Sequence, residues 1–260
     1  MLLASCAVTP LTNKLSVGED AIVIGVGEGP DGLTDLYAGS AAGGAVYRLT
    51  FTRLQERAPR LSAAGTRLVF LRSSPVETTD PEPEIVVLDL LSNAERGLRL
   101  PRESGAPMAV AWLPSDTAIG IRTPAGIWVS PAPPAAMAVR RLAGADSAAV
   151  DSVLGVTLGD PVVAVVVACE GGAGVCVRTG TGVIQTLDRT GSGVTRWGTD
   201  SVGYWSGSSY AVRSLGGGTI RHPVWRSTPR QFRELTYNAG SAGSAGSAGR
   251  RATAQPEPPR

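Results

Sequence analysis

The hydrophobic and polar positions of the chain form short runs that are typical of β-strands. Polar turns precede apolar or alternating runs of strand length, as in "GEDAIVIGV", "AAGTRLVFL", "PSDTAIGIR", "LGDPVVAVV" and "GTDSVGYWS". Short runs of this kind, bounded by turn-forming residues, favour strands over helices. The 33 glycines and 19 prolines among 260 residues indicate many turns, so we expect an all-β protein.

The same runs recur at a regular interval. Alignment on the turn residues gives spacings of 45, 51, 44 and 40 residues between Asp20, Gly65, Asp116, Asp160 and Asp200. A period near 40 residues predicts a propeller or a solenoid. We expect a β-propeller of five four-stranded blades. Six blades with one degenerate unit is an alternative, and a two-sheet sandwich with coincidental spacing is another.

A second pair of segments agrees with this repeat. "YAGSAAGGAVYRLTF" from Tyr37 and "YAVRSLGGGTIRHPV" from Tyr210 share Tyr-Ala, a Gly-Gly turn and a following Arg. Each predicts a strand, a tight turn and a strand, because glycine supplies the positive φ of such turns. The alignment places His222 on a strand. The segment "QFRELT", residues 231–236, is available to pair with the first unit, which would close the ring and hide its edges.

These residues resemble the TolB-type propeller repeat, from about Ala21 to Thr236. The matching residues, in order, are Arg48, Leu49, Thr50, Pro59, Ser62, Gly65 and the run "LVFLR". Ala63 and Ala64 replace the Pro-Asp of the family, whereas the third unit keeps Trp112, Pro114 and Asp116. The resemblance implies a propeller that binds other proteins at one face of the disc.

Three segments are predicted. Residues 1–18 form a truncated lipoprotein-like leader and linker, 19–238 the propeller, and 239–260 a disordered tail whose Ala-Gly-Ser repetition cannot bury apolar surface. "MLLASC" resembles the end of a bacterial lipoprotein signal, with Cys6 as the lipidated residue. Only five residues precede Cys6, fewer than the apolar segment of about 7–15 residues that export requires.

Charge and cysteine usage define the expected environment. A net charge of +2 with scattered arginines argues against a nucleic-acid partner.

Cys169 and Cys176 flank "EGGAGV". If residues 171–174 form the hairpin loop, Glu170 pairs with Val175 and the two cysteines form the next pair across the strands, close enough for a disulfide. Two unpaired thiols are the alternative. We expect an exported, lipid-anchored monomer of the bacterial cell envelope, in the periplasm or on the cell surface.

The sequence contains few of the residues and motifs that catalytic centres usually require. His222 is the only histidine, no Gly-x-Ser-x-Gly occurs, and "DPEPE" from Asp80 alternates its carboxylates with prolines. We therefore expect no catalytic centre, no metal and no cofactor. Asp20, Asp116, Asp160 and Asp200 could supply a carboxylate pair, but their shared turn position favours caps of backbone N–H groups.

The predicted function is a non-enzymatic scaffold that binds envelope proteins. Alternatives are a propeller that binds carbohydrate or peptidoglycan, and the propeller part of an envelope hydrolase. Tryptophans would stack on sugars if several met at the channel mouth, although core positions are the more usual place for them. The candidate rim residues are Asp116, Asp160, Asp200, Trp112 and Trp197, and the other tryptophans are Trp128, Trp205 and Trp225.

Overall fold

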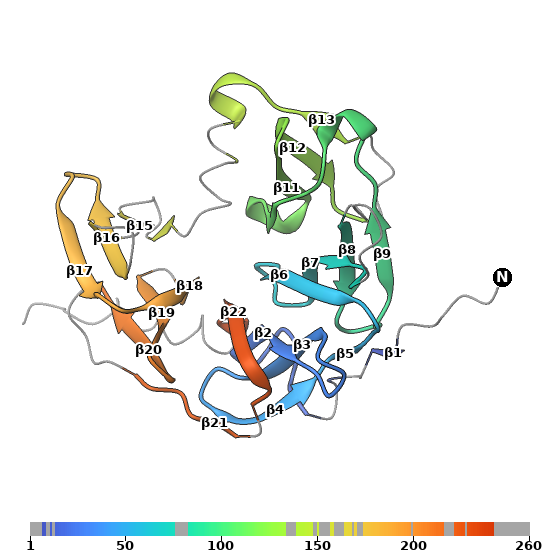
Figure 1. Cartoon of the computed structure of the whole chain (residues 1–260). Coiled ribbons are helices and arrows are strands. Elements are labelled where there is room, and N and C mark those ends of the chain that lie inside the picture. Colours follow the sequence, from blue (N-terminus) through green and yellow to red (C-terminus); the bar gives the residue numbers. More distant parts are fainter. Residues whose placement is uncertain are drawn as a thin grey trace, which may run out of the picture.

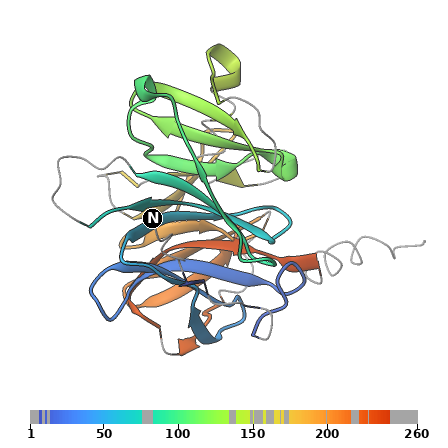
Figure 2. The same ribbon diagram turned by 90° about the vertical axis from the view of Figure 1, so that its right-hand side faces the viewer.

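Five sheets stand around a common centre as the blades of a ring (Figure 1), which confirms the predicted five-bladed propeller. In the side view of Figure 2, the green strands near residues 110–130 lie at the top and the blue strands near residues 22–40 at the bottom. The computed structural model describes residues 7–8, 11, 14–75, 83–133, 139–147, 150, 157–158, 164–167, 169–170, 174–198, 200–215, 221–226 and 228–241.

The strands of each blade follow one another from the centre outward. Blade 1 consists of β22 (Arg230–Asn238), β2 (Ile22–Glu28), β3 (Thr34–Ser40) and β4 (Gly44–Arg48), with the short β21 (Trp225–Arg226) added at its outer edge. Blade 2 consists of β6 (Gln55–Leu61), β7 (Arg67–Ser73), β8 (Glu84–Asp89) and β9 (Glu95–Leu98). Blade 3 consists of β10 (Ala109–Trp112), β11 (Ala118–Thr123), β12 (Gly126–Pro131) and β13 (Arg140–Arg141).

The last two blades complete the ring. Blade 4 consists of β14 (Thr157–Leu158), β15 (Ala164–Val167), β16 (Val175–Thr179) and β17 (Ile184–Asp188). Blade 5 consists of β18 (Ser192–Arg196), β19 (Ser201–Ser206) and β20 (Ser209–Ser214). Outside the blades lie β1 (Ala7–Val8), which pairs with β5 (Thr50–Phe51), and two short 3-10 turns, η1 (Arg102–Ser104) and η2 (Pro114–Asp116).

The sequence repeat corresponds to the second strand of every blade. The five aligned runs lead into β2, β7, β11, β15 and β19, each of which lies between two neighbours in its sheet. A strand in this position is covered on both faces by adjacent blades and therefore reads as a nearly continuous apolar run. In β7, Leu68 and Phe70 pack toward blade 1, whereas Val69 and Leu71 pack toward blade 3.

The ring is closed by the C-terminal strand. β22 pairs antiparallel with β2, so the innermost strand of blade 1 comes from the opposite end of the chain. The expectation that residues 231–236 close the ring is confirmed. Side chains of β22 also reach blade 2: the Thr236 hydroxyl accepts a hydrogen bond from the Leu61 N–H at 3.1 Å, and the Asn238 amide donates to the Ala63 carbonyl at 2.7 Å.

The segment predicted as leader and linker contributes to this core. β1 lies within residues 1–18, and the side chains of Leu11 and Leu15 are buried in the cluster that joins blades 1 and 2. Cys6 and residues 242–260 lie outside the described residues.

The disulfide between Cys169 and Cys176 is present, with 5.0 Å between the two Cα atoms. The predicted register is wrong, because Cys176 pairs across the ladder with Val167 and not with Cys169. The ladder of β15 and β16 thus ends two residues earlier than a four-residue loop would allow, and Cys169 reaches Cys176 from beyond the end of β15.

Candidate functional site

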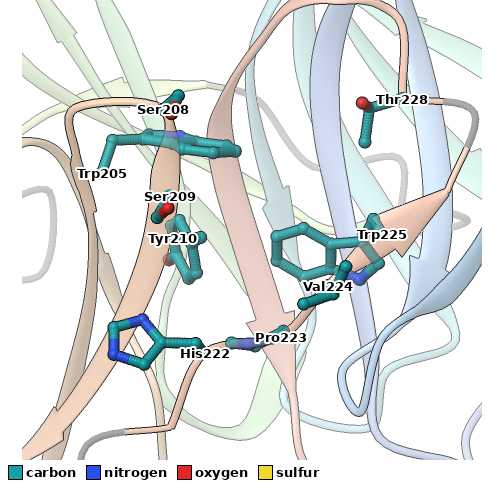
Figure 3. A pocket seen from close by; sticks show the side chains of 9 residues that line it. All are labelled: Trp205, Ser208, Ser209, Tyr210, His222, Pro223, Val224, Trp225 and Thr228. Carbon is teal, nitrogen blue, oxygen red and sulfur yellow. The ribbon is translucent and has the colours of Figure 1, made fainter.

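A pocket opens between blade 5 and blade 1 (Figure 3). Its volume is about 190 Å³, and its walls come from the hairpin of β19 and β20, the segment 222–224 and the start of β21 (Trp225–Arg226). The lining residues are Trp205, Ser208, Ser209, Tyr210, His222, Pro223, Val224, Trp225 and Thr228. Ligand sites for drug-sized molecules measure about 300–1,000 Å³, so this pocket fits a single ring or one side chain.

Beside the pocket, the described residues of blade 5 pair with an outer segment at Arg221 alone. Arg221 exchanges two backbone hydrogen bonds with Val212 of β20, at 2.8 and 2.9 Å. Two residues further along this antiparallel register, Pro223 would face Tyr210. Proline has no N–H and cannot continue the ladder. The chain instead turns to blade 1, where Trp225 and Arg226 pair in parallel with Gly44 and Ala45 of β4.

The prediction that His222 lies on a strand is therefore wrong. His222 is exposed and belongs to the segment between the Arg221 bridge and β21, at the edge of the pocket. The signal that could have revealed this is the neighbouring proline, which interrupts the strand pattern at the very next position.

Aromatic rings form the inner wall. Trp205 and Trp225 lie with their ring centroids 6.5 Å apart, and Tyr210 approaches both, at 5.1 and 5.4 Å. The Trp225 indole N–H donates to the Ser40 carbonyl at 2.8 Å, which fixes this ring against blade 1. Trp205 is only partly buried. Such a wall provides an apolar face on which a ring or an apolar side chain can stack.

The polar groups of the pocket are largely uncharged. Hydroxyls of Ser208, Ser209 and Thr228 lie on the exposed side together with the His222 imidazole. Burial raises the pKa of the Tyr210 phenol, so this side chain stays neutral. With hydroxyls and one imidazole as hydrogen-bonding groups, the pocket suits a neutral or weakly polar ligand.

The predicted aspartates do not form a common site. Asp116 accepts hydrogen bonds from the backbone N–H groups of Ala63 and Ala64 in blade 2, Asp20 from Ser16 N–H within its own turn, and Asp200 from the adjacent Ser201 hydroxyl. Asp160 lies outside the described residues. Within the described part of the chain, no cluster of three or more His, Cys, Asp or Glu could hold a metal ion.

The predicted tryptophans take different positions. Trp112 is buried between blades 2 and 3 and donates its indole N–H to the Arg60 carbonyl at 3.0 Å. Trp197 stacks on Tyr237 with 4.3 Å between ring centroids. Neither lines the pocket. The two tryptophans that do share it, Trp205 and Trp225, were named in the sequence only as members of the whole set.

A second polar cluster, largely buried, joins β5 to blade 2. Arg72 bridges the carboxylates of Glu56 and Glu95 at 2.8 Å each, and the Thr50 hydroxyl donates to Glu56. Burial raises the pKa of the Glu56 carboxyl against the opposing effect of Arg72. Because these groups pair with one another and hold β5 and three strands of blade 2 together, we interpret the cluster as a structural lock.

Similarity to known proteins lies in the fold. Neither a protein-family model nor a curated protein matches the chain. Solved structures that it resembles include a prolyl endopeptidase, at 12% identity and TM-score 0.38, covering 79% of this chain and 43% of that one. The tricorn protease gives 13% identity and TM-score 0.33, covering 78% of this chain and 21% of that one.

A third similar structure is a protein described as a 6-phosphogluconolactonase from Bacteroides fragilis. It gives 11% identity and TM-score 0.31, with 80% of this chain and 68% of that chain covered. The present chain thus spans less than half the length of the first two proteins. No helix of the described residues is long and apolar enough to cross a membrane.

These comparisons correct the predicted function. The similar structures are those of two peptidases and a lactonase, which goes against the expectation of a non-enzymatic scaffold and against the expectation that the protein is no enzyme. At this level the likeness describes a fold and assigns no activity or residue to this chain. Any function must therefore be argued from the pocket itself.

Proposed function

We propose that the chain is the substrate-binding propeller of a hydrolase, and that the pocket of Trp205 and Trp225 holds one ring or side chain of the substrate. The observation that carries this proposal is the convergence of three aromatic rings and a hydroxyl-rich rim at one open pocket. Concave sites that combine apolar walls with a few polar groups are the usual form of a ligand site.

The place of His222 connects this pocket to hydrolysis. His222 is the only histidine of the chain, and it lies at the pocket edge together with Ser208 and Ser209. Histidine is the side chain that most often acts as general acid or base in hydrolysis. The experiment below therefore measures substrate turnover as well as ligand binding.

The experiment uses the purified chain with panels of fluorogenic peptides and glycosides. Binding is followed by intrinsic tryptophan fluorescence and turnover by release of the fluorophore. We expect at least one panel to contain a ligand whose affinity falls about tenfold in W205A, since a stacking contact is worth about 0.5–1.5 kcal/mol beyond buried area. F51A, which removes an exposed ring on β5, is the control and should bind normally. Absence of binding in both panels, or equal binding by W205A, would contradict the proposal.

We propose that the protein works outside the cytoplasm. The disulfide supports this, because such bonds persist in oxidising compartments. Residence in a bacterial cell envelope, attachment through a lipid on Cys6 and membership of the TolB-type repeats belong to the same proposal. Labelling of cells with a clickable fatty acid tests the anchor: label on the wild type that is lost in C6A supports it, and label that persists in C6A contradicts it.

A further inference from the structure

Trp205 is the ring of the pocket wall that is most open to solvent. It is half-buried, whereas Trp225 is 9% exposed and Tyr210 less than that. Tyr210 and Phe232 meet the Trp205 ring edge-on, with 72° and 76° between the ring planes and centroids 5.1 and 6.5 Å away. Because these neighbouring rings fix its orientation, Trp205 presents a preformed aromatic surface that loses little conformational entropy when a ligand stacks on it.

The polar groups around this ring can both donate and accept hydrogen bonds. The exposed residues Ser208, Ser209 and Thr228 each contribute a hydroxyl, which donates one hydrogen bond and accepts others. A neutral imidazole has one donor and one acceptor nitrogen, and that of His222 is also exposed. In the view of Figure 3, Ser209 lies between Trp205 and His222. The aromatic surface is thus bordered by groups that match alcohol hydroxyls, which donate and accept in the same way.

The main chain beside the pocket offers a bound peptide no strand edge. Tyr210 is 2% exposed with its backbone included, and Val212 already exchanges two backbone hydrogen bonds with Arg221. Among the described residues that line the pocket there is no carboxylate, ammonium or guanidinium group. A peptide would therefore be held by one side chain alone, and an ionised ligand would lose its hydration without gaining an ionic partner.

We propose that the pocket beside Trp205 binds one pyranose ring of a neutral saccharide. When its hydroxyls are equatorial, both faces of such a ring consist of C–H bonds, which stack on the negative π face of an aromatic side chain. The hydroxyls project from the edge of the ring and exchange hydrogen bonds with Ser209, Thr228 and His222. The volume of about 190 Å³ suits a single ring. The inference rests on the proposed function and names its substrate class.

The first test compares two ligands on the full chain. Methyl β-D-glucopyranoside is neutral and has equatorial ring substituents, and methyl β-D-glucopyranosiduronate, its matched control, differs by one carboxylate. Intrinsic tryptophan fluorescence follows both titrations. We expect the glucoside to bind and the glucuronide to bind about tenfold more weakly, because its charge finds no ionic partner in the pocket. Equal affinities of the two ligands overturn the inference.

The second test changes the protein. W205A should weaken glucoside binding about tenfold, and W205F, which keeps an aromatic ring among its neighbours, should weaken it less. F51A removes an exposed ring outside the pocket and should bind normally. H222A should weaken binding about threefold, the contribution of one hydrogen bond, and H222Q, which restores a donor and an acceptor, should recover it. Glucoside binding that is unchanged in both Trp205 variants, or in H222A, overturns the inference.

A peptide probe separates this inference from the proposed function. Acetyl-leucine amide carries an apolar side chain and no sugar ring, and it is titrated in the same way. If it binds with an affinity that falls in W205A while the glucoside does not bind, the inference is overturned and the proposed function stands. If no member of the peptide and glycoside panels binds, both fail.

Discussion

The Asp116 carboxylate accepts a hydrogen bond from the backbone N–H of Ala63, a residue 53 positions earlier in the chain and one blade away. The second oxygen of the same carboxylate accepts from Ala64 N–H, at 2.9 Å. The turn in blade 2 is thus held by an aspartate of blade 3. The sequence predicts that Asp116 caps backbone N–H groups of a turn, and the structure shows that the capped turn belongs to the neighbouring blade.

The first prediction concerns this link. D116N keeps the shape of the side chain but leaves one oxygen for two donors, so the free energy of unfolding should fall by about 1–3 kcal/mol, the usual contribution of a hydrogen bond to a charged group. Urea denaturation measures it. D200N is the control and should change stability little, because among the described residues the Asp200 carboxylate bonds to the hydroxyl of the neighbouring Ser201. Equal stability of D116N and the wild type would contradict the link.

A pH dependence follows from Asp35. This fully buried carboxylate pairs with Arg48 at 2.5 Å, and burial raises the pKa of Asp35 against the opposing effect of Arg48. At pH values between the ordinary pKa of Asp and the raised pKa of Asp35, the Asp35 carboxyl stays protonated in the folded protein but is ionised in the unfolded chain. The free energy of unfolding of the wild type, minus that of D35N, should therefore be greatest at acid pH. It should decline as the pH rises from the ordinary Asp pKa to the raised pKa of Asp35.

Urea midpoints of the two proteins at intervals from about pH 3.5 to pH 7 measure this difference, a range that starts near the ordinary Asp pKa. A difference that rises with pH would show that the Arg48 ion pair outweighs burial, contrary to the account.

The disulfide gives a third prediction. Closing a loop of this length stabilises a fold by about 2 kcal/mol in the chain-entropy description, so the double variant C169A/C176A should lose about that amount. Non-reducing peptide mapping of protein from an oxidising compartment should recover the linked pair, and C6S should leave it unchanged. Two free thiols at these positions would contradict the bond and the proposed export.

The closing strand gives a fourth prediction. A chain that ends at Thr228 lacks β22, which exposes the inner edge of β2 and removes Phe232 and Leu235 from the core between blades 1 and 5. We expect it to lose cooperative thermal unfolding. A chain that ends at Ser241 keeps all of β22 and should unfold at the wild-type temperature. Cooperative unfolding of the shorter chain would show that the ring does not depend on β22.

The sequence predicted the parts of the fold that depend on local pattern. The second strands of the blades were found because burial on both faces leaves a continuous apolar run, and β22 was found because "QFRELT" had no place in the repeat. The pairing of Cys169 with Cys176 needed only a short hairpin. Its register was missed because nothing in the spacing fixes where a glycine-rich loop begins.

The pocket could not be predicted in the same way. It arises where Pro223 ends the pairing with β20 and the chain crosses to β4, a partner that is far away in sequence. The repeat alignment placed the same residues on a regular outer strand and so concealed the break. Trp205 and Trp225 meet only after this crossing, so the sequence pattern did not single them out and named Trp112 and Trp197 as candidates instead.

The central claim is that ligand binds between Trp205 and Trp225. The chain has five tryptophans, and each indole N–H gives its own signal in a proton–nitrogen correlation spectrum, assignable by single substitutions. Titration with the best ligand of the peptide and glycoside panels should shift the signals of Trp205 and Trp225 and leave those of Trp112, Trp128 and Trp197 in place. Shifts confined to the other three tryptophans, or no shift at saturating ligand, would contradict the account.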